Sequence, residues 1–152
     1  GFLTKDDIII APNQAIYDPE YWVMAVLCSR LHNVWSRTVN GRVRTDIRYS
    51  SVLCYNTFPI PPLTDQQKES FETHVVNVNI EREKHSEKTL SQLYSPSKMP
   101  PGLLQAHQDL DVAVERAYRS KPFNSDEERL EFLLSLYEGM IQAAKGKAHA
   151  KV

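Results

Sequence analysis

Arginine is the residue type that gathers most conspicuously in this chain. Between positions 30 and 48 the sequence holds five of them against one carboxylate, Asp46, although the formal net charge of the 152 residues is −1. A guanidinium group presents a planar fork of donors that suits phosphate oxygens and the edge of guanine. We therefore predict a local basic surface on a chain that is not, as a whole, a non-specific polyanion binder. Its arginines are Arg30, Arg37, Arg42, Arg44 and Arg48.

No catalytic constellation accompanies this surface. The five glycines form no phosphate-binding loop, and no Gly-x-Ser-x-Gly elbow is present. Cys28 and Cys54 lie among apolar residues, which predicts buried, reduced thiols, and the five histidines lack metal-ligand spacing. The run from Tyr55 to Pro59 lacks the adjacent prolines of an amino-methylating loop. We predict no catalytic residue, no metal and no cofactor site in this chain.

The first two arginines are expected on a helix over residues 19–39. Asp18 is a favourable N-cap, proline follows it, apolar residues then recur every three or four positions, and an Asn-Gly pair ends the pattern. Arg30 and Arg37 lie seven apart, which is two turns along one side, next to the apolar face. Two interpretations stay open: an ion-paired or solvated rim, and a pair that reaches a partner.

The other three arginines are expected on a strand. Residues 42–49 and 51–58 predict two short strands, and period two places Arg42, Arg44 and Arg48 on one face. Such a face could meet phosphates or bases, or it could protect an exposed edge strand by its charge.

Prolines at 59, 61 and 62 mark the expected boundary, and the rest of the chain predicts helices. Thr64-x-x-Gln67 and Ser125-x-x-Glu128 have the form of capping boxes. Helices are expected from about 64 to 84, over 89–94, from 100 to 119 and from 125 onward. The predicted fold class is α+β, mainly α: a small N-terminal α/β portion over 1–62, a C-terminal helical bundle over 63–145 and a frayed tail over 146–152. No apolar run is long enough to span a membrane.

Several ordered motifs resemble one known family. Leu27-Cys28-Ser29-Arg30-Leu31-His32 with Trp35, Gly41-Arg42, Arg48-Tyr49-Ser50 and Tyr55-Asn56-Thr57-Phe58-Pro59 are followed downstream by Leu93-Tyr94-Ser95-Pro96 and by Phe123 with Ser125-Asp126. Together they strongly resemble the C-terminal part of type IIG/IIL restriction–modification enzymes of the MmeI kind, over almost the whole chain.

The resemblance implies a role in reading DNA. Residues 1–62 would be the end of a target-recognition domain and 63–145 a C-terminal helical domain, with catalytic modules located before Gly1. Those modules would comprise an adenine-N6 methyltransferase that uses S-adenosylmethionine and, as an open second possibility, an endonuclease with magnesium. The implied partners are double-stranded DNA and the missing methyltransferase and nuclease modules, in the cytoplasm. The implied DNA contacts are Arg42, Arg44 and Arg48 first, Arg30 and Arg37 next, and Tyr49, Ser50 and Asn56 as weaker candidates.

A competing hypothesis is a helical scaffold or protein-interaction module without DNA contact. It predicts arginines paired with carboxylates inside the fold, whereas DNA recognition predicts arginines that face solvent. An independent small enzyme is the least favoured interpretation, because the sequence shows no catalytic constellation.

Overall fold

The structure, a computed structural model, describes residues 4, 6–10, 13–40, 42–43, 46–47, 49–95 and 97–149, the side chains of 42–43, 46–47 and 147–149 excepted. The described part is mainly helical, as predicted. Its elements in chain order are helices α1 (Tyr21–Cys28) and α2 (Arg30–Val39), strands β1 (Arg42–Val43) and β2 (Asp46–Ile47), the π-helical turn η1 (Ser51–Tyr55), and helices α3 (Asp65–Glu83), α4 (Leu90–Leu93), α5 (Pro101–Tyr118) and α6 (Asp126–His149).

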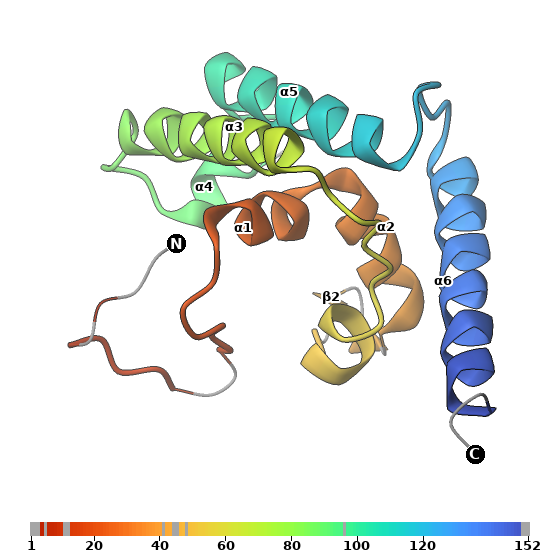
Figure 1. Ribbon diagram of the computed structural model, residues 1–152. Coiled ribbons are helices and arrows are strands. Elements are labelled where there is room, and N and C mark those ends of the chain that lie inside the picture. Colours follow the sequence, from red (N-terminus) through yellow and green to blue (C-terminus); the bar gives the residue numbers. More distant parts are fainter. Residues whose placement is uncertain are drawn as a thin grey trace.

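The helices form two connected groups (Figure 1). Helices α3 and α5 run antiparallel side by side, and α1 packs against α3. Helix α6 stands apart from this pair and packs against α2. The expected C-terminal bundle therefore consists of one helix pair, and the last helix uses the N-terminal part of the chain as its support.

The helix predicted over 19–39 is two helices with a break at Ser29. Ser29 has extended backbone angles, φ −74° and ψ 158°, and its hydroxyl accepts a hydrogen bond from the His32 N–H. Glu20, and not Asp18, occupies the N-cap position of α1, without a capping hydrogen bond to its side chain, and Asp18 has φ +45°. Serine is a good N-cap, so it can start a new helix within a continuous apolar pattern.

The predicted N-terminal α/β portion is not supported. Strands β1 and β2 pair antiparallel only at Arg42↔Ile47 and Val43↔Asp46. The strand expected over 51–58 is wrong, because 51–55 is the turn η1, in which the Ser50 hydroxyl accepts a hydrogen bond from the Leu53 N–H. Cys54 is the one buried residue of η1. The β-favouring residues of this turn therefore lack the packing against a sheet that stabilises a strand.

The downstream helices follow their local sequence more closely. The Thr64–Gln67 capping box is present in both directions, and Pro101 opens α5. The second predicted box is only half formed: the Ser125 hydroxyl accepts from the Glu128 N–H, but the Glu128 carboxylate accepts from the Asn124 N–H instead. Helix α6 continues to His149, so the tail expected to fray from 146 is helical that far, and 150–152 lie outside the described residues.

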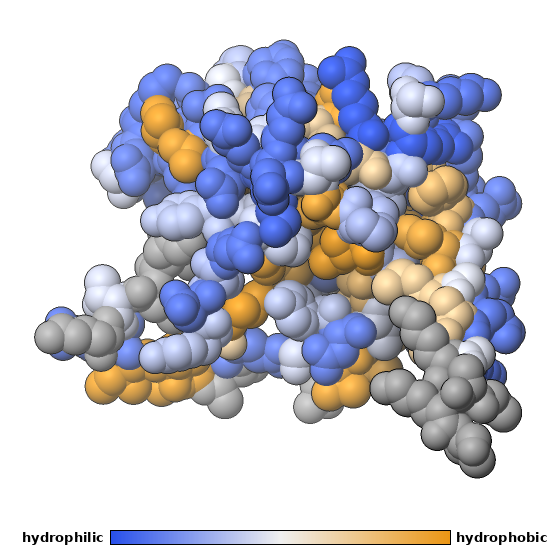
Figure 2. Space-filling model, in the orientation of Figure 1, coloured by the Kyte–Doolittle hydropathy of each residue, from blue (hydrophilic) through white to orange (hydrophobic). Residues whose placement is uncertain are grey.

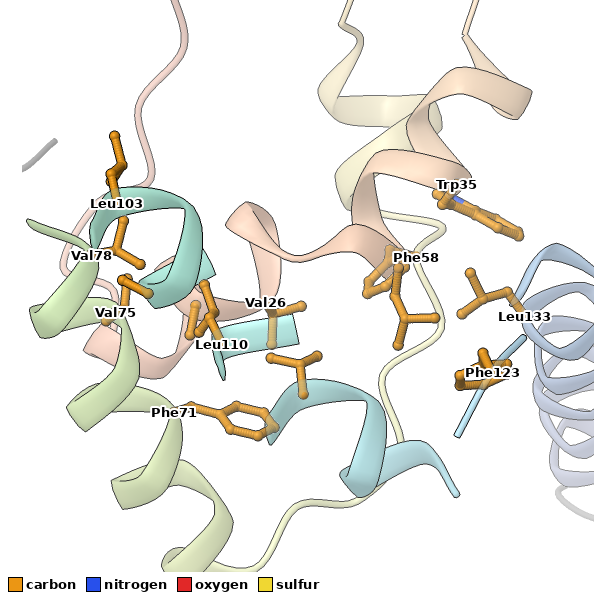
Figure 3. Packing of buried hydrophobic residues seen from close by; sticks show 14 of the residues in the cluster. Val26, Trp35, Phe58, Phe71, Val75, Val78, Leu103, Leu110, Phe123 and Leu133 are labelled. Carbon is orange, nitrogen blue, oxygen red and sulfur yellow. The ribbon is translucent and has the colours of Figure 1, made fainter. Parts of the chain in front are cut away.

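One hydrophobic core joins the two halves of the chain (Figure 3). At one end Phe71 and Val75 of α3 pack with Leu110 of α5, and at the other Leu133 of α6 lies near Trp35 of α2. Packing thus continues across the extended segment where the domain boundary was predicted. Among the described residues, no helix is long and apolar enough to cross a membrane.

Candidate nucleic-acid interface

Arg30 is held by carboxylates at the start of α2. Its side chain donates two hydrogen bonds to Asp126 of α6, from Nε to Oδ1 at 2.9 Å and from an Nη to Oδ2 at 2.6 Å. Its backbone N–H donates to Asp111 Oδ1 of α5 at 2.6 Å. A single residue thereby connects three helices whose sequences lie far apart.

The contact belongs to a wider ion network. Arg129 of α6 lies 2.6 Å from Glu115 of α5 and 3.4 Å from Asp126. The hydrogen bond from Arg30 lowers the pKa of Asp126 below its ordinary value, whereas burial raises the pKa of Asp111 to about 6. The scaffold hypothesis predicts arginines paired with carboxylates inside the fold; Arg30 is paired with Asp126, but its side chain is 51% exposed.

Arg37 has the opposite environment. It lies in the last turn of α2, is exposed, and within the described part of the chain has no carboxylate at salt-bridge distance. Its guanidinium is therefore accessible to an outside partner, as DNA recognition predicts. The backbone of Arg42 follows in β1, while the side chain of Arg42 and the whole of Arg44 and Arg48 lie outside the described residues.

The weaker candidates differ in what they touch. The Tyr49 hydroxyl lies 3.0 Å from Nε2 of buried His32, and burial raises the pKa of Tyr49 to about 12 and lowers that of His32 to about 4. Ser50 is used internally, because its hydroxyl caps η1 and its N–H donates to the Asn40 side chain. Asn56 ends η1 and is exposed.

A cleft of about 550 Å³ opens beside these residues, between the segment around Gln14, the α1–α2 junction and η1. Figure 2 shows apolar surface at the lower left, over the N-terminal segment, in which Ile8 and Ile10 are exposed. The cleft's described lining includes no carboxylate that could accept the ribose hydroxyls of S-adenosylmethionine. These residues do not fit that cofactor. Within the described ranges, no three His, Cys, Asp or Glu side chains converge as a metal site requires.

Sequence reasoning missed the residues that organise the site. Asp111 and Asp126 lie 81 and 96 positions from Arg30, and no spacing rule links them. Asn40 was expected only as part of a helix stop, yet its side chain connects α2 to the segment before η1.

Comparison with protein families gives the class of protein to which this mainly helical chain belongs. The chain belongs to the MmeI family: residues 1–62 match the target recognition domain of MmeI, and residues 63–144 match its C-terminal domain.

Two relatives support this assignment. DNA methyltransferase A of Bacillus subtilis (strain 168) is 47% identical over 142 residues, which are 93% of this chain and 16% of that protein. The solved structure of the type IIL restriction–modification enzyme MmeI in complex with DNA superimposes with a TM-score of 0.79 at 36% identity, and covers 82% of this chain and 17% of the other. The chain therefore spans about one sixth of the length of each relative.

Proposed function

We propose that this chain binds double-stranded DNA as the recognition and clamping part of a site-specific DNA methyltransferase of the restriction–modification type. The observation that carries the proposal is the exposed position of Arg37 at the end of α2, where no carboxylate of the described residues lies at salt-bridge distance, although the Arg37 charge contributes to lowering the pKa of Asp126. Its support is the match to an MmeI structure in complex with DNA.

The candidate residues divide into those that would contact DNA and one that supports the fold. Arg37, Arg42, Arg44 and Arg48 neutralise phosphates or read guanine, and Asn56 is a further exposed donor and acceptor. Arg30 supports α2, which carries Arg37 and leads into the β1–β2 hairpin. The same surface would keep the duplex in place while a nucleotide is turned out for chemistry, since an enzyme that modifies a base must extract it from the stack.

For the longer protein we propose adenine-N6 methylation with S-adenosylmethionine in a module outside this chain. Endonuclease activity, with magnesium, is a further possibility for that protein. This chain's share of the reaction is to hold and orient the DNA, and none of its described residues is assigned to the chemical step.

The scaffold hypothesis remains the second candidate, because Arg30 is paired as it predicts. Arg30 and Arg37 on one helix allow a matched test by fluorescence anisotropy with a mixed duplex at several salt concentrations. Four arginines on phosphates predict a slope of log K against log salt of about −4, and Arg37→Ala should make it shallower by about 1. Arg30→Ala should leave the slope unchanged and lower the thermal midpoint.

The triple change R42A/R44A/R48A should make the slope shallower by about 3. Absence of binding at low salt would refute DNA binding by this chain and leave the scaffold function. Binding with equal slopes for all variants would refute these arginines as the phosphate contacts.

A further inference from the structure

Asn40 is a buried polar side chain at the end of α2, and it bonds on both sides of the hairpin. Its amide nitrogen donates to the Ser36 carbonyl at 2.8 Å and to Cys54 Sγ of η1. Its amide oxygen accepts the Ser50 N–H at 3.1 Å. One side chain thus closes a loop between positions 40 and 50, the interval that contains β1 and β2.

The hairpin needs such a closure. Strands of two residues, paired antiparallel at two positions, do not hold a conformation by themselves in water. The Asn40 contacts fix the chain entering β1 against the chain leaving β2, with one end on α2 and the other on η1. Only an amide of this length supplies both the acceptor for Ser50 and the donors for the other two groups.

We propose that Asn40 is the positioning residue of the arginine-bearing hairpin: it sets the direction in which the hairpin leaves α2 toward DNA. The inference rests on the proposed DNA binding. Asn40 itself does not touch the nucleic acid, being 9% exposed and bonded internally. It acts by keeping the binding-competent hairpin populated.

The test is the DNA affinity of Asn40→Ala at fixed salt, well below the thermal midpoint. If only about a tenth of the molecules keep the competent hairpin, the apparent Kd rises about tenfold. Val75→Ala is the matched control, because it opens a cavity in the core between α3 and α5, far along the chain from the hairpin. It should lower stability and leave Kd unchanged.

A double-mutant cycle separates the two proposals. In the R42A/R44A/R48A background, Asn40→Ala should have no further effect on Kd. If the triple change alone leaves Kd unaltered, the proposed DNA surface fails. If the triple change weakens binding but Asn40→Ala does not, or does so equally in both backgrounds, the positioning role of Asn40 is refuted.

Hydrogen exchange on the unmodified chain provides a readout that does not require the variant to fold. The Ser50 amide should exchange slowly, because it donates to Asn40 Oδ1. Exchange of that amide at the unprotected rate would overturn the inference.

Discussion

Asp111→Asn should stabilise this protein at neutral pH, and its effect should vanish in acid. Asp111 of α5 accepts the Arg30 N–H at 2.6 Å, so it satisfies a backbone donor at the start of α2. Burial raises the pKa of this carboxyl from 3.8 to about 6, against the smaller lowering effect of that same hydrogen bond. Asparagine keeps an acceptor oxygen for Arg30 but carries no charge to desolvate.

The magnitude follows from linkage. A carboxyl whose pKa is higher in the folded than in the unfolded state binds its proton more tightly when folded, so ionisation lowers stability as pH rises from about 4 through about 6. A difference of roughly two pKa units corresponds to about 3 kcal/mol. We expect the free energy of unfolding of Asp111→Asn to exceed that of the unmodified chain by about 2–3 kcal/mol at pH 8, and to match it near pH 4.

Urea denaturation at pH 4, 6 and 8 measures this difference. Comparing the two proteins at each pH removes the titration of other groups that they share. Asp109→Asn is the control, because Asp109 lies two positions away on α5 and is exposed, so its effect should stay below about 0.5 kcal/mol. If Asp111→Asn destabilises the protein more at pH 8 than at pH 4, the negative charge at the start of α2 is stabilising; if its effect is equal at all three pH values, the carboxyl does not titrate with a raised pKa. Either result would refute the reasoning.

Three further predictions concern stability. Burial lowers the pKa of His32 from 6.5 to about 4, so between pH 7 and 4 mainly the unfolded histidine takes up a proton. Over that range the free energy of unfolding, measured in urea, should fall by about 3 kcal/mol more for the unmodified chain than for His32→Gln. Equal losses would contradict this. Leu133→Ala, at the fully buried contact of α6, should cost about 2–5 kcal/mol in urea. Thr64→Ala removes the capping box of α3 and should cost about 1 kcal/mol, seen as a lower thermal midpoint; an unchanged midpoint would show that α3 is held by packing alone.

The C-terminal helices were predictable because their limits are encoded locally. A capping threonine with glutamine three residues later, or a proline at the first helical position, acts within one turn of chain. In the structure Thr64 is the N-cap of α3, and Pro101 is the first residue of α5. Helix starts of this kind depend little on the rest of the fold.

The N-terminal portion was less predictable because distant partners determine it. The break at Ser29 requires an acceptor for the Arg30 N–H, and Asp111 provides it from α5. The segment after Ser50 has β-favouring residues, but among the described residues β1 pairs only with β2, over two residues of each strand. Intrinsic β-propensity predicted strands, but without neighbouring strands to pair with, this segment does not form one.

The candidate site shows the same division. Helical periodicity correctly placed Arg30 and Arg37 on one side of α2, but it could not distinguish their roles, because the partner of Arg30 lies 96 positions away. Counting charges identified the basic interval but could not reveal that Arg30 forms an ion pair with Asp126. The roles of Arg42, Arg44 and Arg48 stay predictions.

The scaffold and recognition hypotheses meet in helix α2, whose two ends have different tasks. Its start is fixed by Asp111 and Asp126, and its end carries Arg37 and leads into the hairpin. A ten-residue helix is about 15 Å long, so tilting its start by about 10° moves its end by roughly 2.6 Å, which is enough to lose a hydrogen bond. A residue that never touches DNA can therefore weaken binding by misplacing one that does. Replacing such a positioning residue changes the affinity without changing the number of phosphates contacted. The slope of log K against log salt therefore distinguishes it from a residue that contacts a phosphate.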